Sequence, residues 1–150
     1  MADSLPTPPL TAAERRLALW LRGLGIVFAL GAVGALLRAD GLVRNLNALG
    51  RVLRLPVVSV PTGPVASDFW FALAVANLAT NAVCAWMAST DVRGRRGFAY
   101  PVVISHLVSA GTALLLLVRW SAAFPIVGLF VVDLAVAVIV IGVLRAAPRT

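Results

Sequence analysis

Residues 124–144 read FPIVGLFVVDLAVAVIVIGVL, a stretch that is apolar throughout except for one aspartate. A transmembrane α-helix needs about 20 mostly apolar residues to cross roughly 30 Å of hydrocarbon. Three other stretches meet the same requirement, at about residues 17–37, 69–88 and 98–118. The sequence therefore predicts an all-α, polytopic membrane protein built as a bundle of four transmembrane helices.

The composition supports this prediction and excludes several classes of protein. Of the 150 residues, 61% are hydrophobic and 13% are charged, whereas a soluble domain has about 25% charged residues. The basic residues behind the net charge of +7 are all arginines and lie mostly near the ends of the predicted spans, so they do not indicate nucleic-acid binding. The single cysteine, Cys84, excludes an intramolecular disulfide and a Cys-based zinc site, and no motif predicts a cofactor, a metal site or a catalytic residue.

Two segments lie outside the predicted spans. Residues 1–10 contain three prolines and predict a flexible tail that precedes a single membrane domain at residues 11–147. Residues 41–55 predict an amphipathic helix lying in the membrane interface. Its leucines share one face and its polar residues the other: Leu42, Leu46, Leu49 and Leu53 against Arg44, Asn47, Arg51 and Arg54. A helix that closes the mouth of the bundle without binding lipid fits the same pattern, and both interpretations stay open.

Several residues have the chemistry of helix starts. Thr11 and Glu14 fit a capping box, in which a hydroxyl and a carboxylate accept hydrogen bonds from free backbone amides. Ser67 and Asp68 are predicted to cap the second span, and Ser121 to cap the fourth.

The distribution of arginine predicts the orientation in the membrane. With four spans, both termini and the loop at residues 89–97 share one side, which carries eight arginines against five on the other side. The positive-inside rule therefore predicts cytoplasmic termini. We expect a multi-pass protein of the cell (inner) membrane, in contact with the lipid bilayer and with other membrane subunits or further copies of itself.

One carboxylate lies where hydrocarbon is expected. Asp133 is near the middle of the fourth span, and an ionised aspartate facing lipid there costs about 2.5–3.5 kcal/mol. Asp133 must therefore face the interior, be protonated or have a partner. Counting outward from each loop places it in one layer with His106, Asn77, Asn81 and Ser109. Such a layer is either a set of interhelical hydrogen bonds that fixes the packing or a binding or proton-handling site.

The remaining candidate site residues are arginines at the membrane interface. Contacts with lipid headgroups are predicted for Arg22, Arg44, Arg51 and Arg54. Arg22 lies about one turn inside the first span, where its long side chain can extend outward to the interface. Four glycines make the same span smooth and predict close packing within the bundle or against another subunit: Gly23, Gly25, Gly31 and Gly34.

Some of these features also occur together in a known group. The first span contains the sequence WLRGLG at residues 20–25, a long connection with prolines follows it, and Phe69-Trp70 opens the second span. The last span contains Asp133, shortly before Arg145. In these features the chain resembles the small bacterial four-helix membrane proteins grouped as DoxX-like. The resemblance implies a membrane bundle, in some cases an accessory subunit of a redox or export complex, and carries over no catalytic residue.

Three functions are compatible with the sequence. The absence of catalytic motifs and the small size favour a non-enzymatic integral membrane protein, acting as a structural or accessory subunit of a larger assembly. The alternative is a small transporter or lipophile-binding protein that uses Asp133, His106 and the asparagines as a proton-linked site. A third possibility is a membrane enzyme acting on a lipophilic substrate, with Asp133 and His106 as acid and base.

Overall fold

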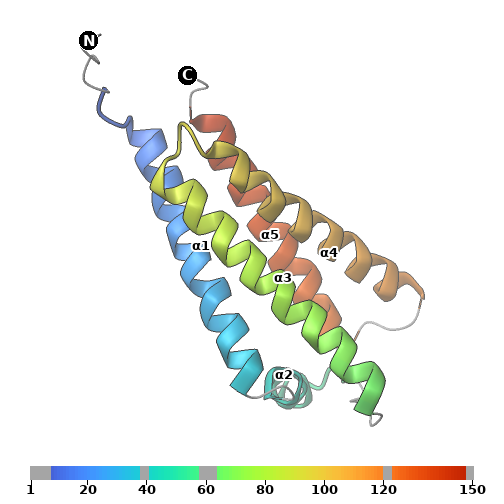
Figure 1. The fold of residues 1–150 in the computed structure, drawn as a ribbon. Helices are drawn as coiled ribbons and strands as arrows, with labels where there is room; N and C mark the ends of the chain where they lie inside the picture. The colour runs from blue at the N-terminus through green and yellow to red at the C-terminus, as the bar shows by residue number, and fades with distance from the viewer. Residues whose placement is uncertain (1–7, 38–40, 58–63, 120–122, 148–150) are drawn as a thin grey trace.

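The computed structural model describes residues 8–37, 41–57, 64–119 and 123–147 (Figure 1). Within these ranges the chain forms helices and no strands. The elements are α1 (Ala12–Leu37), α2 (Gly41–Val52), α3 (Pro64–Thr90), the short 3₁₀-helix η1 (Arg96–Phe98), α4 (Ala99–Arg119) and α5 (Phe124–Ala146). Four of them, α1, α3, α4 and α5, are long and apolar enough to cross a membrane. The predicted all-α bundle with four spans is confirmed.

The capping box at the start of α1 is also confirmed. The backbone N–H of Thr11 donates to Oε2 of Glu14 at 2.7 Å, and the backbone N–H of Glu14 donates to Oγ1 of Thr11 at 3.2 Å. Because these bonds satisfy amides that lack a partner in the first turn, α1 begins at Ala12, about one turn before the apolar stretch.

The other two predicted caps are wrong. Helix α3 begins at Pro64, so Ser67 and Asp68 lie inside it and do not precede it. Helix α5 has Ala123 as its N-cap, without a side-chain hydrogen bond, and Ser121 lies outside the described residues. In both helices a proline occupies the first turn. A proline has no N–H to satisfy there, and its fixed φ suits a helix start, so a capping side chain is less needed.

The four long helices form two antiparallel hairpins. Helix α1 packs along α3, and α4 packs along α5, with fewer contacts between the two pairs. Figure 1 shows the start of α1, the end of α5 and the α3–α4 loop together at one end of the bundle. Helix α2 lies across the opposite end.

Small side chains fill the interior where helices meet. Ala85, Ala88 and Ala99 are fully buried. At Gly25 of α1, an added Cβ would lie only 3.3 Å from the backbone oxygen of Ala82 in α3. Small residues of this kind let helix backbones approach closely, which is how helices associate in lipid.

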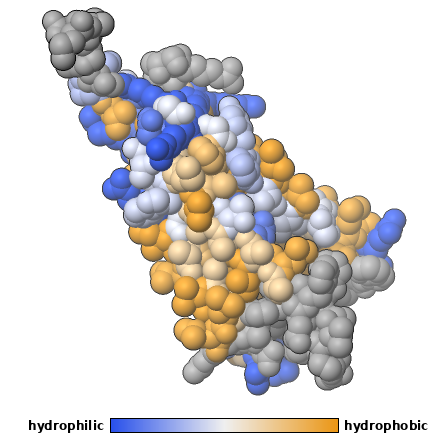
Figure 2. All heavy atoms as spheres, in the orientation of Figure 1, coloured by the Kyte–Doolittle hydropathy of each residue, from blue (hydrophilic) through white to orange (hydrophobic). Residues whose placement is uncertain are grey.

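Most apolar surface of the spans faces outward. Large hydrophobic residues such as Leu30, Ile104 and Val138 are exposed on α1, α4 and α5. Figure 2 shows hydrophobic residues over the middle of the bundle and hydrophilic residues gathered at the end that carries the α3–α4 loop. This is the surface of a multi-pass membrane protein, because exposed apolar belts of this size are not stable in water.

Helix α2 contacts the start of α5. Asn47, placed on the headgroup face by the sequence pattern, is buried. Gly50 is buried beside it, and a Cβ added there would lie 3.2 Å from Cβ of Phe124. Leu49 and Leu53 remain about half exposed. The glycine allows α2 to pack on the bundle through its Asn47–Gly50 side, while Leu49 and Leu53 stay available to acyl chains.

The helix ends at Val52, before the predicted residue 55, in a Schellman-type turn. The N–H of Leu55 donates to the oxygen of Gly50 at 2.8 Å, and the N–H of Arg54 donates to that of Arg51 at 3.0 Å. Arg54 adopts φ 56°, the left-handed conformation that this turn requires.

Candidate functional site

The central polar contact of the bundle joins His106 of α4 to Asp133 of α5. A hydrogen bond of 2.8 Å links Nδ1 of the imidazole to Oδ1 of the carboxylate. The two residues are only 8% and 7% exposed. The structure thus gives Asp133 both an inward orientation and a partner, two of the conditions that its depth in the span imposes.

A third helix contacts this pair through an aromatic ring. Phe28 of α1 stacks on the imidazole of His106, with ring centroids 5.1 Å apart and an interplanar angle of 28°. Phe28 is itself buried, beside Ala82, Ala85 and Val102. The imidazole is therefore held between a carboxylate of its own hairpin and a phenyl ring of the other hairpin.

The second imidazole nitrogen of His106, Nε2, can act as a hydrogen-bond donor or as an acceptor. Nε2 of His106 is buried, and no hydrogen-bond partner for it is found among the described residues. When the His106–Asp133 pair is neutral overall, Nε2 carries a hydrogen and is a donor. When the pair has lost one proton, Nε2 is an acceptor. The hydrogen-bonding character of Nε2 therefore depends on the proton content of the pair.

The asparagines form a second set of contacts in the same part of the bundle. The Ser105 hydroxyl, next to His106 on α4, lies 3.0 Å from Oδ1 of Asn81 on α3. Nδ2 of Asn81 donates to Oδ1 of Asn77 at 3.4 Å. Asn81 is buried, whereas Asn77 is exposed. Ser105, which was not among the predicted site residues, is the serine that joins this set.

Ser109 stands apart from both sets. It lies on α4, one turn beyond His106, and is half-buried. Among the described residues, no hydrogen bond connects its side chain to Asp133. The structure therefore brings His106 together with Asp133, and Asn81 with Asn77, but it does not join all five predicted residues into one network.

These contacts lie on the seam between the two hairpins. The Phe28–His106 stack connects α1 to α4, and the Ser105–Asn81 bond connects α4 to α3. These polar and aromatic contacts add to the apolar packing that joins the two hairpins. A change in charge at His106 or Asp133 would act directly on that seam.

An ion pair at the end of the bundle was not predicted as a unit. Arg93, in the α3–α4 loop, binds Glu14 through two hydrogen bonds, Nε to Oε1 at 2.6 Å and Nη2 to Oε2 at 2.9 Å. It also donates to the backbone oxygens of Pro8 and Pro9. The hydrogen bond to Glu14 raises the pKa of Arg93. From the sequence, Glu14 was assigned only to a capping box and Arg93 only to a basic loop. Their pairing could not be predicted because no sequence pattern connects residues so far apart along the chain.

The predicted headgroup arginines lie on two elements, Arg22 within α1 and the other three on or just after α2. The guanidinium of Arg22 lies over the Trp86 ring, 5.9 Å from its centroid, which is within the range of a cation–π contact. Arg44 and Arg51 are exposed on α2, and Arg54 follows it. Their contact with lipid stays a prediction.

Comparisons of the chain with protein-family models, with curated proteins and with solved structures give no match.

Proposed function

We propose that this multi-pass membrane protein is a small transporter or lipophile-binding protein whose proton-linked site is the His106–Asp133 pair. The observation that carries the proposal is the buried 2.8 Å contact between a carboxylate and an imidazole, together with the buried Nε2 atom that no described group satisfies. Intramembrane ionisable residues commonly serve proton relays and ligand sites.

The energetics favour a functional role over simple packing. Placing an aspartate at the centre of a span costs about 2.5–3.5 kcal/mol, whereas an interhelical hydrogen bond in a membrane contributes about 0.6 kcal/mol on average and about 1.7 kcal/mol at most. One such bond therefore does not offset the burial of Asp133. An apolar pair at these positions would hold the bundle at least as well, so the carboxylate is better explained by what it can bind.

The position of the pair supplies a mechanism. His106 is held against Phe28 of the α1–α3 hairpin, and Asp133 belongs to the α4–α5 hairpin. Gain or loss of a proton changes the hydrogen-bonding character of Nε2 and the charge at the seam. The affinity for a ligand at the seam, and the fit between the hairpins, would then depend on proton content.

Infrared spectroscopy on the protein reconstituted in lipid tests this proposal. We expect the carboxyl and imidazole bands of the pair to change when the pH of the sample is varied. The Asp133→Asn variant should fold but lack this change. Asp91→Asn is the matched control, since it removes an exposed carboxylate of the α3–α4 loop and should leave the change intact.

Two results would count against a proton-linked site. One is a pair whose bands stay constant over the whole pH range. The other is an Asp133→Asn variant that loses expression and helix content together with the spectral change, since this would make the carboxylate a structural element only.

A second candidate function, an accessory subunit of a membrane assembly, is supported by the outer face of α1. Among the described residues, no atom lies within 4 Å of a Cβ added at Gly23 or Gly34. A shallow apolar hollow of about 430 Å³ surrounds the first of these glycines, lined by Leu19, Trp20, Gly23, Leu24 and Val27. A neighbouring helix fits such a face, which agrees with the accessory role that the DoxX-like resemblance implies.

Purification in a mild detergent tests the accessory role. The wild-type chain should co-purify with a defined partner chain, and Gly23→Leu should lose that partner while keeping its helix content. A wild-type protein that is always a solitary monomer would refute it. The proposed location, in the cell (inner) membrane with cytoplasmic termini, rests on the arginine bias, and reporter fusions to each terminus test it.

A further inference from the structure

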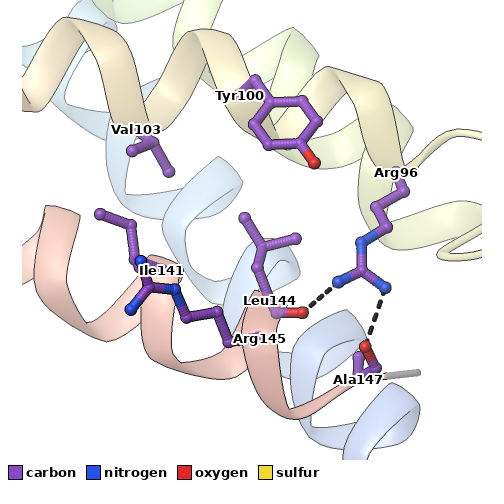
Figure 3. Close-up of a pocket in the computed structure, with 7 residues that line it drawn as sticks. All are labelled: Arg96, Tyr100, Val103, Ile141, Leu144, Arg145 and Ala147. Atoms are coloured by element: carbon purple, nitrogen blue, oxygen red, sulfur yellow. Dashed lines mark hydrogen bonds between the residues drawn. The ribbon is translucent and has the colours of Figure 1, made fainter. Parts of the chain in front are cut away.

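A pocket opens between α4 and α5 at the end of the bundle that carries the α3–α4 loop (Figure 3). Its volume is about 590 Å³, within the range of small-molecule sites. It is lined by Arg96, Tyr100, Val103, Ile141, Leu144, Arg145 and Ala147. These residues divide into an apolar wall and a basic, aromatic mouth.

The two arginines of the mouth have different roles. Arg96 donates to the backbone oxygens of Leu144 and Ala147, and so ties the start of α4 to the last turn of α5. The side chain of Arg145 is exposed and, in Figure 3, runs back along α5 toward Ile141. No hydrogen bond or ion pair of Arg145 is found among the described residues, and no carboxylate is among the seven lining residues.

The depth of the pocket corresponds to the headgroup region. Arg145 lies in the last turn of α5, and Tyr100 lies in the first turn of α4. Arginine and tyrosine at the ends of spans sit where phosphates and acyl chains meet. The pocket also faces the side with the arginine excess, where two more arginines lie close along the chain in the α3–α4 loop: Arg93 and Arg95.

We propose that this pocket binds one anionic phospholipid. Its phosphate pairs with Arg145, the Tyr100 hydroxyl is available as a hydrogen-bond donor to the headgroup, and one acyl chain lies along Val103 and Ile141. Charge complementarity selects the occupant: a cationic mouth without a carboxylate favours an anionic lipid over a zwitterionic one, and the apolar wall favours a lipid over a free anion. The site is separate from the His106–Asp133 pair, so its test does not depend on the proposed function.

Native mass spectrometry of the full chain in detergent measures the binding. Phosphatidylglycerol and phosphatidylcholine with the same acyl chains are added in turn, and the lipid retained per chain is compared. We expect phosphatidylglycerol to be retained in preference, and Arg145→Gln to weaken its binding about five-fold, as one arginine near a lipid surface contributes. Arg145→Lys should keep most of the binding because the charge remains.

Two further variants distinguish specific lipid binding in the pocket from non-specific electrostatic attraction of anionic lipid to the protein. Arg16→Gln removes an exposed arginine from α1, which starts at the same end of the bundle but does not line the pocket, and should leave binding unchanged. Ile141→Phe fills the acyl region and should weaken the binding of phosphatidylglycerol with every charge in place. Equal retention of the two lipids, or equal losses from Arg145→Gln and Arg16→Gln, would overturn the proposal.

Discussion

The pairing of His106 with Asp133 can be tested by removing each partner alone and then both together. His106→Phe keeps an aromatic ring against Phe28 but removes the nitrogen that meets the carboxylate at 2.8 Å. Asp133→Leu removes the carboxylate and leaves Nδ1 of the imidazole without its partner. The double variant replaces the polar contact with two apolar side chains.

The structure sets the expected size of each effect. Both residues are less than a tenth exposed, so each single variant leaves a buried polar group unsatisfied, at a cost of about 1–3 kcal/mol in the free energy of unfolding. If Asp133 is ionised, its isolation in His106→Phe costs about 3–5 kcal/mol. Replacing both partners of a buried polar pair is nearly neutral. The double variant should therefore be more stable than either single variant.

Reversible unfolding of all four proteins in mixed micelles, followed by circular dichroism, supplies the free energies. We expect a coupling energy of at least about 2 kcal/mol between His106 and Asp133, well above what independent sites show. Losses that simply add would refute it, because they would mean that neither group depends on the other. If the double variant is stable but lacks the pH-dependent change in its infrared bands, the pair is needed for function and not for folding.

Three other substitutions test the packing around the site. Gly25→Leu should lower the free energy of unfolding by about 1–3 kcal/mol because the new side chain meets the α3 backbone. Gly23→Leu is the control and should not lower it, because its side chain points into open space. Equal losses from the two variants would contradict the close packing of α1 on α3 at Gly25. Arg93→Ala should lower the midpoint temperature of thermal unfolding because it leaves the buried Glu14 carboxylate without its cation. An unchanged midpoint would show that the Arg93–Glu14 ion pair does not stabilise the fold. Arg54→Gly should raise the free energy of unfolding by about 1 kcal/mol, since glycine adopts φ 56° without strain, and a fall would mean that the arginine side chain contributes more than its backbone strain costs.

The transmembrane architecture follows directly from the sequence, because crossing a bilayer requires a long apolar helix and each of the four stretches is one. The helix starts were harder to predict. Thr11 and Glu14 form the capping box expected of them, but Ser67 and Asp68 have cap chemistry inside a helix that a proline had already begun. Cap residues and helix-start prolines compete as signals, and local sequence alone does not decide between them.

The sequence predicted the depth of a residue in the membrane better than the direction in which its side chain points from the helix. Counting from the loops put His106 and Asp133 close enough to consider a bond, and the structure forms one. The same counting placed Asn77 in the layer, yet its side chain is exposed, because the rotation of α3 depends on which face its small residues turn toward α1. The pairing of Glu14 with Arg93 could not be anticipated for a similar reason. It depends on how the α3–α4 loop folds over the end of α1.

That loop contributes one arginine to each hairpin. Arg93 fastens the end of α3 to the start of α1, and Arg96 fastens the start of α4 to the end of α5. Each hairpin thus has its own arginine, and only Gly94 and Arg95 lie between the two. We expect such a protein to fold in two stages during synthesis, with the first hairpin formed before the second leaves the ribosome. Fragments 1–95 and 96–150, produced as separate chains, should also reassemble in the membrane. Failure of the fragments to associate would show that the bundle needs the continuous α3–α4 loop as well as the contacts of Arg93 and Arg96.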